Sequence, residues 1–474
     1  MCIRDRAQLD PHSTYSDAEE VKKMNEPLQG NFEGIGVQFQ MIEDTLLVVQ
    51  PVSNGPSEKI GILAGDRIIA VNDSAIAGVK MSTEEIMKRL RGPKGSKVNL
   101  KIVRRGVQDP LVFTVKRDKI PILSLDASYM IQPKTGYIRI NRFGATTAEE
   151  FKKAMKELQK QGMKDMILDL QGNGGGYLNA AIDLANEFLG QKELIVYTEG
   201  RTAKRSDFYA KGNGEFRNGR LIVLVDEYTA SASEIVSGAV QDWDRGIIVG
   251  RRSFGKGLVQ RPIDLPDGSM IRLTIARYYT PAGRCIQKPY DSSTDYNKDL
   301  IERFNHGELM NADSIHFPDS LKVQTKKLGR TVYGGGGIMP DYFVPIDTTL
   351  YTDYHRNLVA KGAVIKFTMK FIEGHRKELA NKYKKFESFN EKFIIDDDML
   401  ATLREMGEKE GVKFNEEQYQ KSLPLIKTQL KALIARDLWD MNEYFRVMNT
   451  TNESVQKALE ILNSEEYQKK LRAN

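Results

Sequence analysis

The sequence predicts a multidomain α/β protein that ends in a helical region. Its 474 residues exceed one ordinary domain, and a prior of about 150 residues per domain gives roughly three. Strand-like and helix-like runs alternate over residues 123–345, which is typical of a core with parallel strands inside. From about residue 348 the strand patterns nearly vanish, and the chain becomes helical and highly charged.

The composition is that of a globular protein. Hydrophobic residues make up 40% of the chain and charged residues 28%. No stretch approaches the ~20 apolar residues that span a bilayer. The net charge of +6 arises from Lys and Arg spread among Asp and Glu, which indicates a solvated mixed-charge surface. We therefore expect neither a transmembrane segment nor a nucleic-acid partner.

Cysteines and metal-ligand patterns exclude several kinds of site. Cys2 and Cys285 are the only cysteines, so a disulfide framework and a cysteine-rich zinc site are excluded, and we expect a structural role for Cys285. No His, Asp and Glu cluster has metal-ligand spacing, so no metal or other cofactor is expected.

The first six residues lack an apolar core and are not a signal peptide. Because residues 9–15 already read like the inside of a folded unit, we expect the chain to be truncated or misassembled at its start.

The first folded module is predicted over residues 33–119, after an N-terminal segment of residues 1–32. It combines short strands with one helix, which begins at Ser82 as a capping box and ends before the turn at residues 92–95. Its strand-like runs are residues 37–40, 45–49, 61–72 (a turn leading into a strand), 98–103 and 111–115.

The central domain is predicted over residues 120–347. Residues 290–330 are polar and irregular and look like a surface insertion, and residues 334–337 form a glycine turn. Its strands are expected at residues 137–140, 166–170, 221–225 and 247–249, and its helices at 147–161, 177–189 and 231–243. The helical region then covers residues 348–474, with helices at 416–436 and 453–462 among others.

The first candidate for chemistry is the segment TASASE, residues 229–234. It follows a strand and opens a helix, which exposes a hydroxyl at the top of a sheet near helix-end N–H groups that favour developing negative charge. Ser231 or Ser233 can equally be a helix N-cap, so the segment by itself leaves both interpretations open.

The second candidate is SFGKGLVQ, residues 253–260. Lys256 lies between glycines after an apolar strand, and a lysine held in a dry site has a lowered pKa and can act as a base. If the stretch from residue 257 is extended, Gln260 shares a face with Lys256 and can hydrogen-bond its amine. A surface lysine in a glycine turn is the alternative.

The third candidate is LDLQGNGGGY, residues 168–177, where a strand ends in a glycine-rich turn that leads into a helix. Such turns aim consecutive backbone N–H groups at one point, which indicates an anion or oxyanion site. A tight turn with no ligand is the alternative.

Two phosphate-binding sequence patterns are matched only in part. Residues 250–257 nearly match G-x-x-x-x-G-K-[ST], but Gly257 lacks the hydroxyl for magnesium, and residues 258–260 look extended rather than helical. Residues 172–177 end in Tyr177, where a dinucleotide fingerprint needs Gly or Ala. A nucleotide-binding enzyme is therefore disfavoured.

Histidine gives no catalytic signal. None of the five lies in the glycine-rich α/β segments, so nothing points to a Ser–His–Asp triad, although triads assemble in space. We expect ordinary surface or core roles for His12, His306, His316, His355 and His375.

Taken together, these segments resemble the carboxyl-terminal processing peptidases (tail-specific proteases, family S41), over roughly residues 9–345. Each motif is weak, but the ordered set is specific. In chain order the motifs are LDPHSTY (9–15), FEGIGV (32–37), AGDRIIAVN (64–72), RGPKG (91–95), LDL with GGG (168–176), SASE (231–234), FGKGLVQ (254–260), TPAGR (280–284) and GGGGIMPD (334–341).

The resemblance implies a PDZ domain over residues 33–119 and a crotonase/ClpP-like β/α spiral as the protease core. It implies that Ser231, not Ser233, is the nucleophile and that Lys256, 25 residues later, is the general base. Gln260 would orient the lysine. The oxyanion hole would be the backbone of Ala232 with that of Gly175 or Gly176. Gln171 stands where relatives often carry Arg, with no obvious catalytic consequence.

The expected function is that of a serine endopeptidase with a Ser–Lys dyad, which a larger ammonium fraction at low pH should inhibit. Its PDZ domain would add a peptide as an extra strand and cap the free C-terminal carboxylate with N–H groups of Gly34, Ile35, Gly36 and Val37. The resemblance also implies a place in the cell envelope or periplasm, and the helical region suits packing on the core or a homo-oligomer. The alternative from another class is a non-catalytic PDZ adaptor or scaffold.

Overall fold

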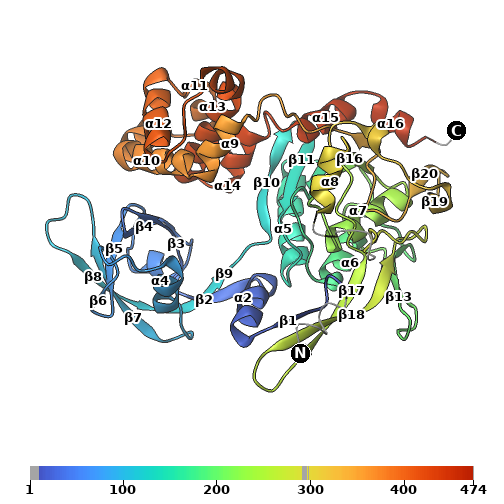
Figure 1. The fold of residues 1–474 in the computed structure, drawn as a ribbon, viewed down its shortest axis with the longest axis horizontal. Helices are drawn as coiled ribbons and strands as arrows, with labels where there is room; N and C mark the ends of the chain where they lie inside the picture. Colours follow the sequence, from blue (N-terminus) through green and yellow to red (C-terminus); the bar gives the residue numbers. More distant parts are fainter. Residues whose placement is uncertain (1–9, 291–295, 297, 473–474) are drawn as a thin grey trace. The chain divides into compact units, whose positions relative to one another are not determined.

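The computed structural model describes residues 10–290, 296 and 298–472. Cys2, the first six residues and Leu9 of the LDPHSTY motif lie outside the described residues. The chain divides into two compact units (Figure 1). One contains the described residues up to Gly30 with Leu123–Thr348 and Asn449 onward, and the other contains Asn31–Ile122 with Thr349–Met448. The domain limits given above stay a prediction.

A mostly parallel sheet forms the centre of the first unit. Strand β10 runs antiparallel to β11, and every other neighbouring pair is parallel. In order across the sheet the strands are β10 (Leu125–Gln132), β11 (Thr135–Ile140), β12 (Asp165–Asp169), β15 (Leu221–Val225), β16 (Ile247–Gly250) and β21 (Tyr342–Phe343). β12, β15 and β16 are buried along their whole length, which explains their continuous apolar runs and confirms the predicted buried strands.

The predicted helices of this unit are confirmed with slightly different ends. They are α5 (Thr147–Lys160), α6 (Leu178–Asn186) and α7 (Ala232–Asp242), and they pack with the apolar sheet residues into one large core. α15 (Glu453–Asn463) also belongs to this unit and packs against β15 and β16.

A second, antiparallel sheet forms one wall of the candidate site. Its order is β1 (Thr14–Ser16), β18 (Met270–Tyr279), β13 (Leu194–Glu199) and β14 (Ser206–Tyr209), and β17 (Leu258–Asp264) pairs with β18. The extended stretch expected after residue 257 is confirmed as the start of β17. The hairpin partner was not predicted, because half-exposed residues and Pro262 obscure the alternation in this strand.

Helix α2 (Ala18–Gln29) was also missed. Asp17 caps it by accepting a bond from Glu20 N at 2.8 Å, and the Glu20 carboxylate accepts one from Asp17 N at 3.1 Å. The helix ends at Gly30 in the left-handed conformation.

The second unit contains a small β domain. The predicted helix is α4 (Thr83–Leu90), and Ser82 caps it by accepting a bond from Glu85 N at 3.2 Å. The sheet order is β3 (Val37–Ile42), β4 (Thr45–Pro51), β5 (Arg67–Val71), β7 (Lys97–Val103) and β8 (Leu111–Lys116), with β6 (Ser74–Ala75) beside β5. β2 (Asn31–Gly34) and β9 (Asp118–Pro121) pair as a separate ribbon. In the part of the chain that the structure describes, β3 is an edge strand with β4 as its neighbour.

The rest of the second unit is helical and has its own apolar core. Its helices are α9 (Asp353–Ala360), α10 (Ala363–Lys382), α11 (Phe386–Lys392), α12 (Asp397–Lys409), α13 (Glu416–Leu438) and α14 (Met441–Met448). None of the helices within the described residues combines the length and apolar character needed to cross a bilayer.

Candidate active site

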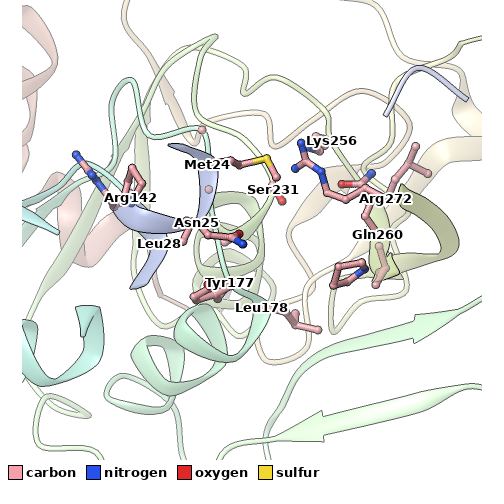
Figure 2. Close-up of a pocket in the computed structure, with 18 of the residues that line it drawn as sticks. Met24, Asn25, Leu28, Arg142, Tyr177, Leu178, Ser231, Lys256, Gln260 and Arg272 are labelled. Carbon is pink, nitrogen blue, oxygen red and sulfur yellow. The ribbon is translucent and has the colours of Figure 1, made fainter. Parts of the chain in front are cut away.

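A cavity of about 730 Å³ lies in the first unit at the carboxyl ends of the parallel strands (Figure 2). Ser231 and Lys256 both line it, as do Ala232, Gln260 and residues 174–176. Its other walls come from α2, β17 and β18. The sequence therefore predicted as separate motifs a set of residues that the fold brings around one cavity.

Ser231 lies in a strained turn between β15 and α7. Its backbone has φ 57° and ψ −114°, a conformation that a residue with a side chain rarely adopts and that costs on the order of 1–3 kcal/mol. Such strain concentrates at functional sites, because it presents a side chain that an ordinary helix start would turn away. Ser233, the alternative hydroxyl, is fully buried and donates to Asn173 O at 3.0 Å. Its role is therefore structural.

The glycine-rich turn lies directly against Ser231. A Cβ placed on Gly175 would lie 2.7 Å from the Ser231 Cβ and 2.9 Å from Ala232 N, and a Cβ on Gly176 would lie 2.1 Å from Phe143 O. Both glycines also have positive φ, 99° and 150°. No other residue type lets this turn approach the serine so closely.

The hydrogen bonding of the backbone N–H groups distinguishes Gly175 from Gly176 as a candidate for the oxyanion hole. The Gly175 N–H donates to Asn173 Oδ1 at 2.8 Å, so it is already used inside the turn. Among the residues that the structure describes, the N–H groups of Gly176 and Ala232 have no such acceptor. Ala232 is also the first residue of α7, where the helix dipole favours negative charge. These two groups are the better oxyanion candidates.

Lys256 lies in the loop between β16 and β17 and is largely buried. Burial lowers the pKa of its ammonium below the ordinary value of 10.5, and the Arg272 guanidinium lowers it further, while Glu234 and Asp10 raise it. The net direction favours a neutral amine, as a base requires. Within the described chain no hydrogen bond joins the Lys256 amine to the Ser231 hydroxyl. Both side chains line the same cavity.

Glu234 ties the serine turn to the lysine loop, a role that the sequence did not reveal. Its buried carboxylate accepts bonds from Ser231 N at 2.8 Å, Lys256 N at 2.8 Å, Gly255 N at 2.7 Å and Ser253 Oγ at 2.5 Å. Burial raises its pKa, and these four bonds oppose that rise by stabilising the ionised form.

Tyr278 of β18 makes a second tie. Its hydroxyl donates to Ser231 O at 3.0 Å and also contacts Lys256 O. Burial raises the pKa of this phenol well above 10, so it keeps the proton that both carbonyls share. The sequence analysis did not identify Tyr278.

Gln260 lies on β17 opposite Thr274 of β18, and its Nε2 donates to Thr274 Oγ1 at 3.4 Å. Figure 2 shows Lys256, Gln260 and Arg272 on one side of the cavity, across from Met24, Asn25 and Leu28 of α2. The Gln260 side chain therefore lies on the same side of the cavity as Lys256, and its bond to the lysine amine stays a prediction.

His12 lies closer to this site than the sequence suggested. Its Nε2 is 2.6 Å from the Tyr296 hydroxyl, and burial followed by the charge of Lys256 lowers its pKa to about 4. The histidine is thus neutral near pH 7. Its bond to Tyr296 gives no support to a Ser–His–Asp triad.

The predicted insertion also contributes to the site. It was expected to be irregular, but it contains α8 (Asp299–Asn305), from which buried Arg303 donates to Ser253 O at 2.9 Å and Phe254 O at 3.1 Å. The extended strand after Lys256 further excludes the P-loop alternative, which needs a helix there.

The predicted peptide-binding residues belong to the second unit. Gly34 ends β2, Ile35 is buried, Gly36 has φ 73° and Val37 begins edge strand β3. The Ile35 carbonyl accepts from Ser57 Oγ at 2.6 Å, which fixes the turn.

Three family models match separate parts of the chain. Peptidase family S41 matches residues 134–294, the PDZ domain matches residues 34–119, and a family of unknown function (DUF8443) matches residues 354–440.

Curated proteins are similar over a longer stretch. The carboxy-terminal-processing protease of Bartonella bacilliformis is 40% identical over 286 residues, 59% of this chain and 64% of that protein. A probable CtpA-like serine protease of Staphylococcus aureus is 32% identical over 403 residues, 83% of this chain and 76% of that protein. The chain spans 58–64% of the length of the first three curated relatives that it matches. Among solved structures, the photosystem II D1 C-terminal processing protease is 27% identical, covering 72% of this chain and 79% of that one at a TM-score of 0.37.

Proposed function

The chain belongs to peptidase family S41, and from this membership we propose that it is a serine endopeptidase in which Ser231 is the nucleophile and Lys256 the general base. The predicted resemblance and the predicted fold class, a PDZ domain with a peptidase core and a helical C-terminal region, are confirmed. The dyad, the substrates and a location in the cell envelope are proposals that build on that membership.

The observation that carries the proposal is the strained Ser231 backbone, held against Gly175 in the same cavity as a buried lysine. An adaptor protein would have no use for a conformation that reduces stability and exposes one hydroxyl. The non-catalytic alternative is therefore not favoured.

The proposed reaction is acyl transfer. Neutral Lys256 accepts the proton of the Ser231 hydroxyl as Oγ attacks the scissile carbonyl carbon. The N–H groups of Ala232 and Gly176 hold the oxyanion, and each such donor contributes on the order of 10²–10³ in kcat. The Lys256 ammonium then protonates the leaving amine, and water resolves the acyl-enzyme. Because no hydrogen bond joins the two side chains in the described part of the chain, we expect substrate binding to bring them within hydrogen-bonding reach.

The test is to trap the intermediate. An activated peptide ester mixed with the purified chain and quenched in acid is expected to leave one acyl group, which mass spectrometry locates on the peptide that contains Ser231. Casein should be cleaved under the same conditions. An adduct on another residue, or intact casein at every pH, would reject the assignment.

The PDZ domain is proposed to select substrates by their free C-termini, through strand addition at β3 and N–H groups of the Gly34–Val37 turn. Two peptides that differ only in a free or amidated C-terminus should differ in kcat/KM by about tenfold or more, because the amide cannot accept charge-assisted bonds. The measurement is cleavage at equal concentrations below KM. Equal rates would remove the carboxylate from substrate choice.

A further inference from the structure

We propose that the segment of residues 10–13 is a positioning part of the active site: Asp10 orients the Thr274 hydroxyl, and that hydroxyl orients the amide of Gln260 beside Lys256. The inference rests on the proposed function, since these residues act on the base of that reaction. They lie about 250 residues before the lysine loop in sequence.

Strand β1 brings the segment to the cavity wall. It pairs antiparallel with β18 so that Thr14 lies opposite Arg272 and Ser16 opposite Met270. In this register the residues before Thr14 run alongside the part of β18 that follows Arg272, where Thr274 lies. Arg272 and Gln260 of the same wall line the cavity.

Two hydrogen bonds join the segment to Thr274, and two more hold the segment itself together. Asp10 Oδ1 accepts from Thr274 Oγ1 at 2.8 Å and from His12 N at 2.9 Å, while Oδ2 accepts from Ser13 Oγ at 2.5 Å. Ser13 Oγ in turn accepts from Thr274 N at 3.0 Å. Burial raises the pKa of Asp10, but the bonds from Ser13 and Thr274 outweigh burial and lower it, so Asp10 is an anion near pH 7.

The direction of these bonds determines the orientation of the Gln260 amide. A threonine hydroxyl has one proton, and an ionised carboxylate can only accept, so Thr274 must donate to Asp10. Its oxygen can then only accept from Gln260, which turns Nε2 toward Thr274. The amide oxygen is left on the other side, where it can accept a bond from the Lys256 amine. Without the Thr274 hydroxyl the two orientations of the Gln260 amide become comparable in energy. In one of them the amide NH2 group faces the Lys256 amine, so that two donor groups meet.

The charges that face Lys256 come from several elements. Arg272 lies on β18, Glu234 on α7, and Asp10 and His12 in the segment before β1. His12 is neutral near pH 7 because its pKa is about 4. Asp10 is therefore the charged member of the segment, and its negative charge favours the ammonium form of Lys256.

The first arm of the test removes the hydrogen-bond relay that runs from Asp10 through the Thr274 hydroxyl to Gln260, and keeps the negative charge of Asp10. Thr274→Val is nearly isosteric and is expected to lower kcat about tenfold with little change in KM, because it frees the Gln260 amide. Thr274→Ser, which restores the hydroxyl, should recover most of the rate. Thr14→Val is the matched control on the same strand pair. The buried Thr14 hydroxyl has no partner among the described residues, so this variant should keep the wild-type kcat.

The second arm removes the charge and keeps the relay. In Asp10→Asn the amide oxygen can still accept from Thr274, so kcat at its pH optimum should fall less than in Thr274→Val. The loss of a negative charge near Lys256 lowers the pKa of its ammonium. The acid limb of the kcat profile should therefore move to lower pH, whereas Thr274→Val should leave it in place.

The outcomes are distinct. A folded Thr274→Val variant with the wild-type kcat, or an equal loss in Thr14→Val, overturns the relay. An acid limb that does not move in Asp10→Asn removes Asp10 from the site. If wild-type protein shows no cleavage and no acyl adduct, the proposed function fails first, and the variants are then not needed to decide it.

Discussion

Replacing Ser231 by alanine is expected to lower kcat/KM for peptide cleavage by about 10³-fold or more, because it removes the atom that forms the acyl-enzyme. Lys256→Met, which keeps the stem and removes the amine, should have a similar effect. Because the nucleophile and its base act in one step, the double variant should be no slower than the worse single variant. The measurement is kcat/KM of the wild type and the three variants on one fluorogenic peptide.

Ser233→Ala is the matched control. It removes a hydroxyl two residues away that donates to Asn173 O, so it should reduce stability by about 1 kcal/mol and leave kcat within a few fold. Substantial cleavage by folded Ser231→Ala or Lys256→Met would contradict the dyad. So would losses that multiply in the double variant, since they would mean two independent functions.

The parts of the fold that the sequence predicted are those encoded by short apolar runs. Strands β12, β15 and β16 are buried on both faces, so their residues are apolar except at the strand ends. This continuous apolar run identifies each strand in the sequence. Ser231 and Lys256 follow β15 and β16, which are adjacent and parallel. Their carboxyl ends meet at one edge, so a separation of 25 residues in sequence becomes a shared cavity.

The residues that hold this pair could not be predicted, because their partners come from distant segments. Glu234 looks like an ordinary acidic residue in the first turn of a helix, and three of its four bonds exist only after the lysine loop returns over it. Asp10 precedes a three-residue strand whose partner, β18, begins 260 residues later. Short strands and half-exposed hairpins carry little periodicity, so register, and with it the polar network, has to come from the structure.

Glu234 has the largest expected effect among these supporting residues. Its carboxylate is buried, and each of its bonds is donated by the serine turn or the lysine loop. The two loops follow different strands, and the Glu227–Arg251 ion pair is a second link between them. An ionised carboxylate accepts all four bonds, whereas a neutral amide offers one acceptor oxygen and two donors in the same space.

Glu234→Gln is therefore expected to place a donor group where the carboxylate had an acceptor oxygen. Some backbone N–H groups of the two loops would then lack an acceptor. Unfolding free energy should fall by about 2–4 kcal/mol and kcat by about 10²-fold, since a small displacement of Ser231 from Lys256 disrupts attack. Glu187→Gln is the control, because the buried Glu187 carboxylate accepts from Glu215 N at 3.0 Å and pairs with Lys152 at 3.0 Å, and neither partner belongs to the serine turn or the lysine loop. It should lose stability with little loss of kcat. Denaturant titrations and kcat at a temperature where both variants stay folded separate the two effects. If the variants lose kcat equally, the Glu234 carboxylate supports only the fold, and the geometry of the Ser231 turn must come from the strained backbone and Tyr278.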